Sequence, residues 1–378
     1  MFQQLFQRIS NFFFACFIFI ILASVALIIS PGYVQAQTQW LEYQGKPALD
    51  LAPAGPWDAG LVFLPCVIKD GNTLKMWYHG ADKSQIFGSE GQIGYAWSQD
   101  GINWTRHPAP VLSKRPGQWD GGDIIGAEVI KDGNTFRLWY SATPAGVTGP
   151  NGSAIGYATS VDGINWDRQS SPVIQRGPAG EWDSDLIAPS AVIKEGNTFK
   201  MWFDGSMGNF PSPRTAMVGY ATSTDGIHWT KYNDPATTAP PFQFSDPVLQ
   251  TGAPGAFDAP NIHTPSVLKT ASGYEMWYTG YGDLGQIGYA TSKDGIHWTK
   301  YSGNPVLRVP GAVASEFMAP SVILDAGQYR MWYCDFQVDY PFASFIRYAT
   351  AGDQGTVIST VDKRGKLTTT WGTVKSKL

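Results

Sequence analysis

The sequence that decides the fold is Met76-Trp77-Tyr78, followed by Gly94-Tyr95-Ala96 and then by Asp100-Gly101-Ile102-Asn103-Trp104. The same motifs return in the same order, with Met-Trp or Leu-Trp pairs beginning at positions 76, 138, 201, 276 and 331. Successive pairs are 62, 63, 75 and 55 residues apart. One unit of about sixty residues is therefore repeated five times, and we number the units one to five.

Each unit holds short runs of strand type that are separated by turn signals. In unit one these runs are 66–69, 74–78, 93–97 and 104–112, rich in β-branched and aromatic residues, with Asp-Gly or Gly-Asn pairs between them. A unit that is apolar on both faces cannot bury itself alone, whereas four-stranded units stacked around an axis form the blades of a β-propeller. The sequence therefore predicts an all-β fold, a five-bladed β-propeller with four-stranded blades.

The two ends of the repeat predict how the ring closes. Unit five has no Asp-Gly-Ile-x-Trp segment after Ala349. Residues 40–49 (Trp-Leu-Glu-Tyr-Gln-Gly-Lys-Pro-Ala-Leu) parallel residues 298–307 (Trp-Thr-Lys-Tyr-Ser-Gly-Asn-Pro-Val-Leu), which end unit four. We expect this N-terminal segment to be the outer strand of the fifth blade, because that arrangement leaves no exposed sheet edge.

The residues before Trp40 have the features of an export signal. Arg8 precedes an apolar run from Phe12 to Ile29, and Val34-Gln35-Ala36 resembles a cleavage site. This predicts a signal peptide over 1–36, a propeller over 37–353 and a C-terminal tail over 354–378 that packs on or near the propeller. An uncleaved anchor is the alternative, since about eighteen apolar residues can span a bilayer. Either interpretation exports the propeller, so we expect a secreted or periplasmic protein.

Composition narrows the range of partners. Charged residues make up 15% of the chain, aromatic residues 14%, and the net charge is −4. This charge gives no reason to expect a polyanionic partner such as nucleic acid. We expect a monomer that does not bind a membrane once the signal is removed. Cys66 and Cys334 fall in units that are neighbours in a closed ring, and they form either a disulfide or two separate buried thiols.

The repeated motifs resemble those of a known superfamily. A unit reads Pro-Ser-Val-Ile-Lys-x-Gly, then Met-Trp-Tyr-x-Gly, then Gly-Tyr-Ala-Thr-Ser-x-Asp-Gly-Ile-x-Trp, which is similar to the five-bladed propeller glycoside hydrolases. These comprise the arabinanase and β-xylosidase group (family 43), the invertase and levanase group (family 32) and the mannoside phosphorylase group (family 130). The resemblance covers residues 40–353. It implies a single sugar site at one end of the central channel, with carboxylates from the innermost strands.

The catalytic motifs of these families transfer poorly to this chain. Family 43 enzymes carry Asp-Pro on the inner strand of the first blade, where this chain has Leu64-Pro65. The Trp-Met-Asn-Asp-Pro-Asn-Gly, Arg-Asp-Pro and Glu-Cys-Pro motifs of family 32 are absent, as is the Glu-Asp-Pro-Arg motif of family 130. The resemblance therefore indicates the superfamily without assigning one family.

The repeat also separates scaffold from site, because a residue that recurs in most units is explained by the unit itself. Thirteen of the fifteen Trp residues fall in repeat columns and are predicted to pack between blades. We expect structural roles for two columns of aspartate, those of Trp/Phe-Asp (Asp58, Asp120, Asp183, Asp258) and those of the Asp-Gly-Ile-x-Trp turn (Asp100, Asp162, Asp225, Asp294). Trp97 replaces a Thr found in three other units and is a candidate for stacking on a sugar.

Several polar residues at or before the predicted inner strands do not recur. They are Asp123, Glu128, Asp185, Asn261, His263 and Glu316. Glu128 stands in a column of small residues, so desolvation should raise its pKa and suit it to act as a general acid. The alternative is a buried Glu that pairs with a base such as Arg137 or Arg214. Asp123 and Asp185 are either the ionised partner of the acid or exposed loop residues.

The sequence thus predicts an exported enzyme that hydrolyses a polysaccharide or oligosaccharide, without cofactor or metal. The predicted catalytic residues are Glu128, Asp123 and Asp185, and the predicted substrate-binding residues are Glu316, His263, Asn261, Asp204 and Trp97. Paired carboxylates are what glycoside cleavage requires. The rival hypothesis is a non-catalytic, lectin-like propeller. A multivalent lectin would repeat its ligand-binding groups from blade to blade, and these acids are unrepeated, which favours one central site.

Overall fold

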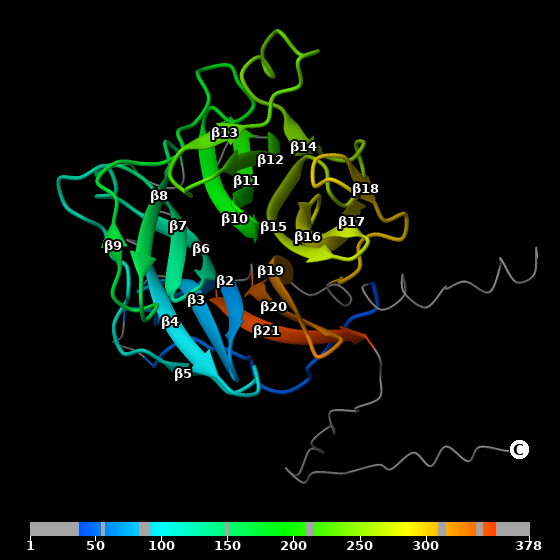
Figure 1. The fold of residues 1–378 in the computed structure, drawn as a ribbon. Coiled ribbons are helices and arrows are strands. Elements are labelled where there is room, and N and C mark those ends of the chain that lie inside the picture. Colours follow the sequence, from blue (N-terminus) through cyan, green and yellow to red (C-terminus); the bar gives the residue numbers. More distant parts are fainter. Residues whose placement is uncertain are drawn as a thin grey trace, which may run out of the picture.

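The computed structural model describes residues 38–53, 57–82, 91–147, 151–208, 215–308, 315–337 and 343–352. Every regular element in these ranges is a β-strand, and Figure 1 shows the strands gathered in groups around a common centre. In the same residues no helix is long and apolar enough to cross a membrane. The predicted signal peptide and the predicted tail lie outside the described residues.

The strands follow the repeat. Units one and two contain β2 (Leu61–Asp70), β3 (Thr73–Ala81), β4 (Gln92–Ser98), β5 (Thr105–Arg106), β6 (Ile124–Asp132), β7 (Thr135–Ala142), β8 (Ala154–Ser160) and β9 (Asp167–Arg168). Units three and four contain β10 (Leu186–Glu195), β11 (Thr198–Met207), β12 (Thr215–Ser223), β13 (Trp229–Lys231), β14 (Pro247–Leu249), β15 (Asn261–Thr270), β16 (Gly273–Tyr281), β17 (Gly285–Ser292) and β18 (Trp298–Lys300). Unit five contains β19 (Ser315–Asp325), β20 (Gln328–Gln337) and β21 (Ala343–Gly352).

Within each unit the strands pair antiparallel in chain order. Units one and two are separate four-stranded sheets, while units three and four share one sheet because a parallel bridge joins Ala216 of β12 to Asn261 of β15. The fourth strand is shorter than the sequence predicts. In unit one it pairs with β4 only over Thr105–Arg106, leaves the sheet, and returns at Leu112 to bridge Ile93.

The N-terminal segment pairs with unit five, as the sequence predicts. β1 (Leu41–Glu42) lies antiparallel to β21, with Leu41 opposite Thr350. Leu49 then bridges Ile346 of β21, just as Leu112 bridges Ile93 in unit one. The resulting sheet has the order β1-β21-β20-β19, so its fourth strand comes from the opposite end of the described chain.

The first strand of each unit lies nearest the centre in Figure 1, and we call β2, β6, β10, β15 and β19 the inner strands. Each contacts the next, and β19 contacts β2. All five carry a β-bulge at the same place, where the register with the second strand shifts. Leu64, Thr264 and Ala319 occupy this bulge with φ of 50°, 48° and 52°. Such values are rare for a bulky or β-branched side chain, so neighbouring contacts must hold the bulge in place.

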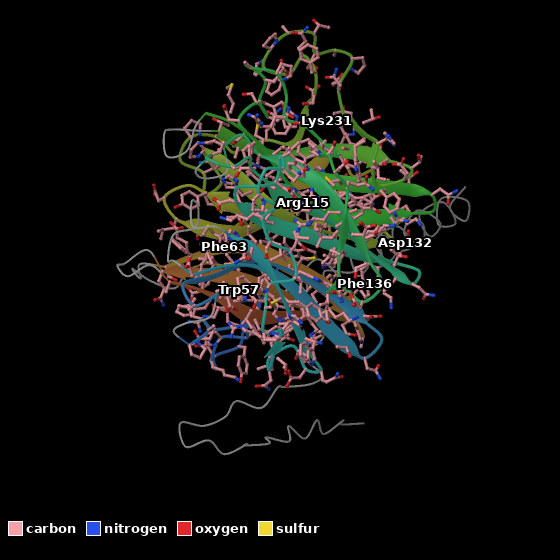
Figure 2. All side chains as sticks on the ribbon, turned by 90° about the vertical axis from the view of Figure 1, so that its left-hand side faces the viewer. Trp57, Phe63, Arg115, Asp132, Phe136 and Lys231 are labelled. Carbon is pink, nitrogen blue, oxygen red and sulfur yellow. The ribbon has the colours of Figure 1, made fainter. Side chains whose placement is uncertain are left out.

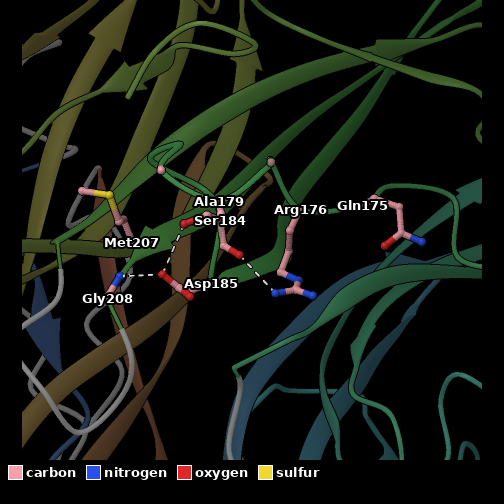
Figure 3. A pocket seen from close by; sticks show the side chains of 9 residues that line it. Gln175, Arg176, Ala179, Ser184, Asp185, Met207 and Gly208 are labelled. Carbon is pink, nitrogen blue, oxygen red and sulfur yellow. Dashed lines mark hydrogen bonds between the residues drawn. The ribbon is translucent and has the colours of Figure 1, made fainter. Parts of the chain in front are cut away.

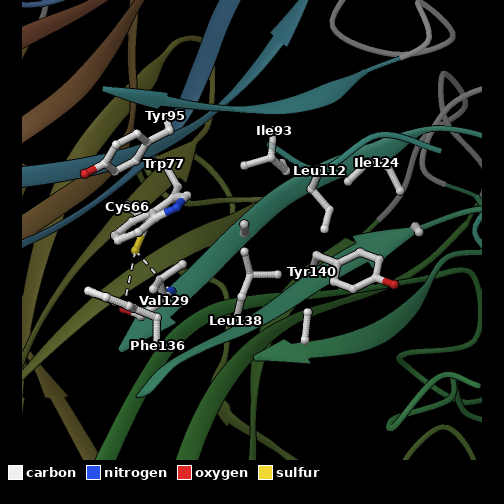
Figure 4. Packing of buried hydrophobic residues seen from close by; sticks show 13 residues of the cluster. Cys66, Trp77, Ile93, Tyr95, Leu112, Ile124, Val129, Phe136, Leu138 and Tyr140 are labelled. Atoms are coloured by element: carbon white, nitrogen blue, oxygen red, sulfur yellow. Dashed lines mark hydrogen bonds between the residues drawn. The ribbon is translucent and has the colours of Figure 1, made fainter. Parts of the chain in front are cut away.

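Contacts between units explain the repeated tryptophans. Trp77 is fully buried beside Tyr95 and Phe136 (Figure 4). Its indole N–H donates to the carbonyl of Gly163 in the turn of unit two at 2.8 Å. Trp139, Trp202 and Trp332 make the same bond to Gly226, Gly295 and Gly101 of the next unit. Trp77 and Trp139 each belong to a buried cluster that joins residues of two neighbouring units, which confirms the predicted packing role. Figure 2 shows the side chains of the described residues on the sheets.

The repeated aspartates are structural as well. In the turn of unit two, Oδ1 of Asp162 accepts the backbone N–H groups of Ile164 and Asn165, both at 2.8 Å. In the Trp-Asp column, Asp58 is buried and accepts the Tyr78 hydroxyl at 2.7 Å. The two cysteines are buried free thiols, Cys66 beside Val129 and Cys334 beside Leu64, so the disulfide alternative is wrong.

Candidate functional site

Four of the predicted site residues lie where inner strands begin. Asp123 immediately precedes β6 and Asp185 immediately precedes β10, while Asn261 is the first residue of β15 and Glu316 is the second of β19. The units share one strand order and their inner strands contact one another in sequence. These four side chains therefore lie at the same end of the inner strands.

Asp123 is buried and held from two sides. Its Oδ1 accepts the backbone N–H of Gly91 at 3.2 Å, and its own N–H donates to Oγ1 of Thr143 at 3.1 Å. The imidazole of His79 lies close enough for the Asp123 carboxylate to act on its charge. Asp123 is thus built into the junction between units one and two, which excludes the exposed-loop alternative for this residue.

Glu316 forms a short hydrogen bond with a tyrosine of unit four. The Tyr281 hydroxyl lies 2.6 Å from Oε1 of Glu316. Burial raises the pKa of the Glu316 carboxyl, and the hydrogen bond from Tyr281 only partly opposes that effect. The sequence-based search missed Tyr281. Its column otherwise holds Ala81, Thr143, Ser206 and Phe336, so the same test of non-recurrence applied to the second strands would have found it.

Asp185 is the most accessible of these acids. It is partly exposed, and its Oδ2 accepts the backbone N–H of Gly208 at 2.7 Å and the hydroxyl of Ser184 at 3.2 Å. Figure 3 shows it in the lining of an open pocket of about 660 Å³, together with Arg176 and Met207. Among the predicted acids, Asp185 combines a fixed carboxylate with access from solvent.

Glu128 lies midway along β6, opposite Trp139, rather than at its beginning. Its Oε1 accepts the N–H of Val192 in unit three at 3.4 Å. In three other units, the side chain in the same repeat column also accepts a backbone N–H from the next unit. Cys66 accepts the N–H of Val129, Ser266 that of Val322 and Ser321 that of Val67. Glu128 therefore occupies a structural column.

Burial raises the pKa of Glu128 to about 8, the direction that its column of small residues predicts. Arg137, its proposed basic partner, pairs with Asp132 instead, and Arg214 lies outside the described residues. Glu128 is five positions from Asp123, which immediately precedes β6, so an extended chain separates their Cα atoms by roughly 16 Å at about 3.3 Å per residue. The strand does not bring these two predicted catalytic residues together as a close pair.

Three predicted substrate-binding residues lie at the junctions of unit four. Both carboxylate oxygens of Asp204 accept the N–H of Thr264, at 2.8 and 3.0 Å, which holds the bulge of β15. Oδ1 of Asn261 accepts the N–H of Ala216 at 3.0 Å. His263 lies on β15 opposite Thr279 and is partly exposed. Asp204 and Asn261 thus tie units three and four together at this end of the strands.

Trp97 does not join the acids. Its register places it opposite Lys75 on β3, and Lys75 pairs with Ile68, near the far end of β2. Its ring is stacked on Tyr95 with centroids 6.0 Å apart. The register thus places Trp97 away from the strand beginnings that carry the acids, and its role in stacking on a sugar stays a prediction.

Around the β-bulges of β2 and β19, the inner strands of units one and five, the side chains are apolar. Leu64 and Met318 pack against a buried cluster that contains Phe63, Ala319 and Cys334. Leu64 is the residue that stands where family 43 carries an aspartate. Between this cluster and Asp123 lies His79, whose two ring nitrogens have no hydrogen-bond partner in the described residues. Burial lowers the pKa of His79 to about 4, although the Asp123 carboxylate opposes the effect.

A metal site was not expected from the sequence. In the described ranges, no group of three or more His, Cys, Asp or Glu side chains is placed to hold a metal ion.

Known proteins with similar sequences support the superfamily. No protein-family model matches the chain. An uncharacterized protein of Mycobacterium tuberculosis is 27% identical over 255 residues, 64% of this chain and 74% of that protein. A beta-1,2-mannobiose phosphorylase of Thermoanaerobacter sp. is 28% identical over 30% of this chain and 36% of its own length. An invertase of Schizosaccharomyces pombe is 27% identical over 47% of this chain and 30% of its own length.

Solved structures match over a larger share of the chain. A glycosyl hydrolase from Bacteroides ovatus has a TM-score of 0.62 at 15% identity, covering 84% of this chain and 94% of its own. The chain shares its fold with glycoside hydrolases and phosphorylases. A structure from the family 130 of mannoside phosphorylases gives 0.63 at 16%, covering 86% and 98%, and a thermostable family 43 glycoside hydrolase gives 0.54 at 18%, covering 76% and 88%. These comparisons bear out the resemblance inferred from the repeat, and no one family is assigned.

Proposed function

We propose that this protein is a carbohydrate-active enzyme that cleaves a glycosidic bond in an oligosaccharide or polysaccharide. The observation that carries the proposal is the grouping of unrepeated acids, Asp123, Asp185 and Glu316, at the same end of the inner strands β6, β10 and β19. A fold shared with glycoside hydrolases and phosphorylases supports it. The site lies at the mouth of a central channel, where side chains from units two, three and five face one another.

Glu316 and Tyr281 are proposed as the acid. A raised pKa favours the protonated form of the Glu316 carboxyl, and Tyr281 is the more exposed member of the pair. When Glu316 is protonated, its O–H donates to the Tyr281 hydroxyl, the reverse of the bond that its carboxylate accepts. As the bond from the anomeric carbon to the glycosidic oxygen breaks, the tyrosine hydroxyl gives its proton to that oxygen and takes the proton of Glu316. Glu316 ends as a carboxylate, and the leaving sugar ends with a hydroxyl group.

Asp185 is proposed as the ionised partner. Its carboxylate is held by Gly208 and Ser184 and is open to solvent. It accepts a proton from a water molecule whose oxygen forms the new bond to the anomeric carbon, and both carboxyl groups then exchange protons with solvent. If inorganic phosphate replaces water as the nucleophile, the acid alone is needed and the product is a sugar phosphate.

The scaffold proposed for this site is a closed five-bladed propeller. Three observations support closure: β19 contacts β2, the indole of Trp332 in unit five donates to Gly101 in unit one, and Ser321 accepts the N–H of Val67. In the proposed ring, the pairing of β1 with β21 completes the fifth blade. Such a ring has no free sheet edge.

Export is proposed from the sequence alone. The apolar run from Phe12 to Ile29 and the motif Val34-Gln35-Ala36 support a signal peptide and a secreted or periplasmic enzyme. Mass spectrometry of protein from its native host should give a mature N-terminus near Gln37. Recovery of the full-length chain in membranes would support the anchor instead.

The activity is tested by screening aryl arabinosides, xylosides, fructosides and mannosides, each with and without phosphate. We expect turnover on at least one of them, with at least a hundredfold loss of kcat in Asp185→Asn and Glu316→Gln, since a positioned acid or base typically contributes about 10² to 10⁴. A Tyr281→Phe variant separates the relay from direct transfer, because only the relay needs the hydroxyl group.

A non-catalytic sugar-binding propeller is the second candidate. Leu64 favours it, because an apolar side chain in an apolar cluster stands where family 43 places an aspartate. Clear sugar binding by the wild-type protein without turnover on any glycoside in the screen would establish this alternative.

A further inference from the structure

The pocket beside Asp185 has features that the proposed chemistry does not use. It lies between the end of unit two and the beginning of unit three, and its volume is about 660 Å³. Its lining consists of Gln175, Arg176, Gly177, Ala179, Gly180, Ser184, Asp185, Met207 and Gly208. Small-molecule pockets usually measure about 300 to 1,000 Å³, so this one is large enough for a sugar unit.

The backbone fixes the carboxylate on one side of this pocket. Oδ2 of Asp185 accepts the N–H of Gly208, and the N–H of Asp185 donates to the carbonyl of Ser206 at 3.0 Å. Gly208 has φ of 98°, a conformation that other residues rarely adopt. Both hydrogen bonds of the Asp185 side chain to described residues use Oδ2, which leaves the acceptor capacity of Oδ1 for a ligand.

Arg176 supplies the opposite charge. One terminal nitrogen, Nη1, donates to the carbonyl of Ser184 at 3.1 Å, and the remainder of the guanidinium is exposed in the pocket (Figure 3). An arginine offers five N–H donors, so four remain for a ligand. Arg176 and Asp185 are each held by the backbone of the pocket, at a point where a hydroxyl-rich ligand can reach both.

The other walls are small or apolar. Met207 is 40% exposed, an unusual exposure for a large apolar side chain at the end of a strand. Gly177 forms part of the wall as a glycine because a Cβ at this position would lie only 2.2 Å from Oδ1 of the buried Asp183. A sugar ring presents C–H groups on one face and hydroxyl groups around its edge, which matches an apolar wall opposite paired donors and acceptors.

We propose that this pocket is a binding subsite for an uncharged sugar unit of the substrate, recognised by Arg176, Asp185 and Met207. The proposal rests on the proposed function, because it takes the ligand to be part of the glycoside cleaved nearby. An anionic sugar would bring its charge toward Asp185 and a cationic one toward Arg176. Hydroxyl groups donate and accept, so a neutral sugar satisfies both side chains at once.

The test is calorimetric titration of the wild-type protein with β-1,2-mannobiose, xylobiose, arabinobiose, sucrose and digalacturonic acid. We expect binding of at least one neutral disaccharide, and a dissociation constant about tenfold higher in Arg176→Ala, which corresponds to the loss of one or two hydrogen bonds. Lys114→Ala is the matched control, since Lys114 holds the same repeat position one unit earlier. Met207→Ser tests the apolar wall independently.

Binding of none of these sugars, binding of the acidic one alone, or an Arg176→Ala variant that binds like wild type would each overturn the subsite. Thermal melting of every variant shows that loss of binding is not loss of folding. Binding that depends on Arg176 without turnover on any glycoside would refute the enzymatic function and leave the subsite standing. Turnover with Arg176-independent binding would do the reverse.

Discussion

The turns between the third and fourth strands are alike in units one to four, whereas the beginnings of the inner strands vary from unit to unit. Each turn has an aspartate that accepts two backbone N–H groups, and each of the four turns accepts the indole N–H of a tryptophan from the preceding unit of the ring. The strand beginnings are instead apolar in unit one, at Leu61, and carry Asp123, Asp185, Asn261 and Glu316 in units two to five. Packing between units requires the same residues at the same positions of each unit. A single binding site instead requires different side chains from different units.

The largest effect should follow from changing a varied strand beginning. Glu316→Gln keeps the shape of the side chain and removes its transferable proton. We expect kcat to fall at least a hundredfold, about 3 kcal/mol in activation free energy, with an unfolding midpoint close to wild type. Steady-state kinetics and urea unfolding measure the two quantities. Unchanged turnover would contradict the inference that the varied residues at the strand beginnings form the active site.

The opposite result is expected for a repeated turn. Asp162→Ala leaves the N–H groups of Ile164 and Asn165 without their acceptor. Unfolding free energy should fall by about 2 kcal/mol, since each lost hydrogen bond costs about 0.5 to 1.5 kcal/mol. Because this turn lies far from the acids, kcat per folded molecule should stay the same. A large loss of kcat with normal stability would contradict the structural assignment.

Glu128 tests the comparison in a second way. It is an acid found in one unit only, but its repeat column has a structural role in three other units. With a folded-state pKa of about 8 and an ordinary value near 4.5, the folded protein holds a proton that the unfolded chain has released between these pH values. Stability should therefore fall as pH rises from about 4.5 to 8. Glu128→Gln should remove this dependence, gaining on the order of 2 kcal/mol at pH 8, with turnover retained. A hundredfold loss of turnover would restore Glu128 as the acid.

His79 predicts a smaller effect of opposite sign. Its folded-state pKa of about 4 lies below the ordinary value of 6.5, so the unfolded chain binds more protons between these limits. Its contribution to stability is present above pH 6.5 and is lost as the pH falls toward 4. His79→Gln should lessen that acid destabilisation by about 1 kcal/mol at pH 5, measured by urea unfolding at several pH values. An unaltered pH profile would show that His79 is hydrated or paired.

The repeat was sufficient to predict most of the fold. Its periodicity located the five units, and the likeness of residues 40–49 to 298–307 predicted the pairing with β21. Column comparison also assigned the turn aspartates correctly, because their partners lie two or three residues away. Such local contacts are visible in sequence.

The site was harder to predict because its contacts cross from one unit to the next. The backbone N–H of Val192 donates to Glu128 from the next unit, sixty-four positions away in the sequence. The hydroxyl of Tyr281 bonds Glu316 across thirty-five positions. No pattern within a unit contains these pairs. Trp97 shows that a break in one column does not by itself give position, since the register places this residue away from the strand beginnings.

The most direct test of the central claim is a crystal structure of Glu316→Gln bound to a glycoside that the wild-type protein cleaves. The glycosidic oxygen should lie within hydrogen-bond distance of the Tyr281 hydroxyl or of residue 316, with the anomeric carbon facing Asp185. A sugar bound instead over the repeated turns, or in the channel beside Glu128 and away from the strand beginnings, would contradict the claim that the varied acids form the active site.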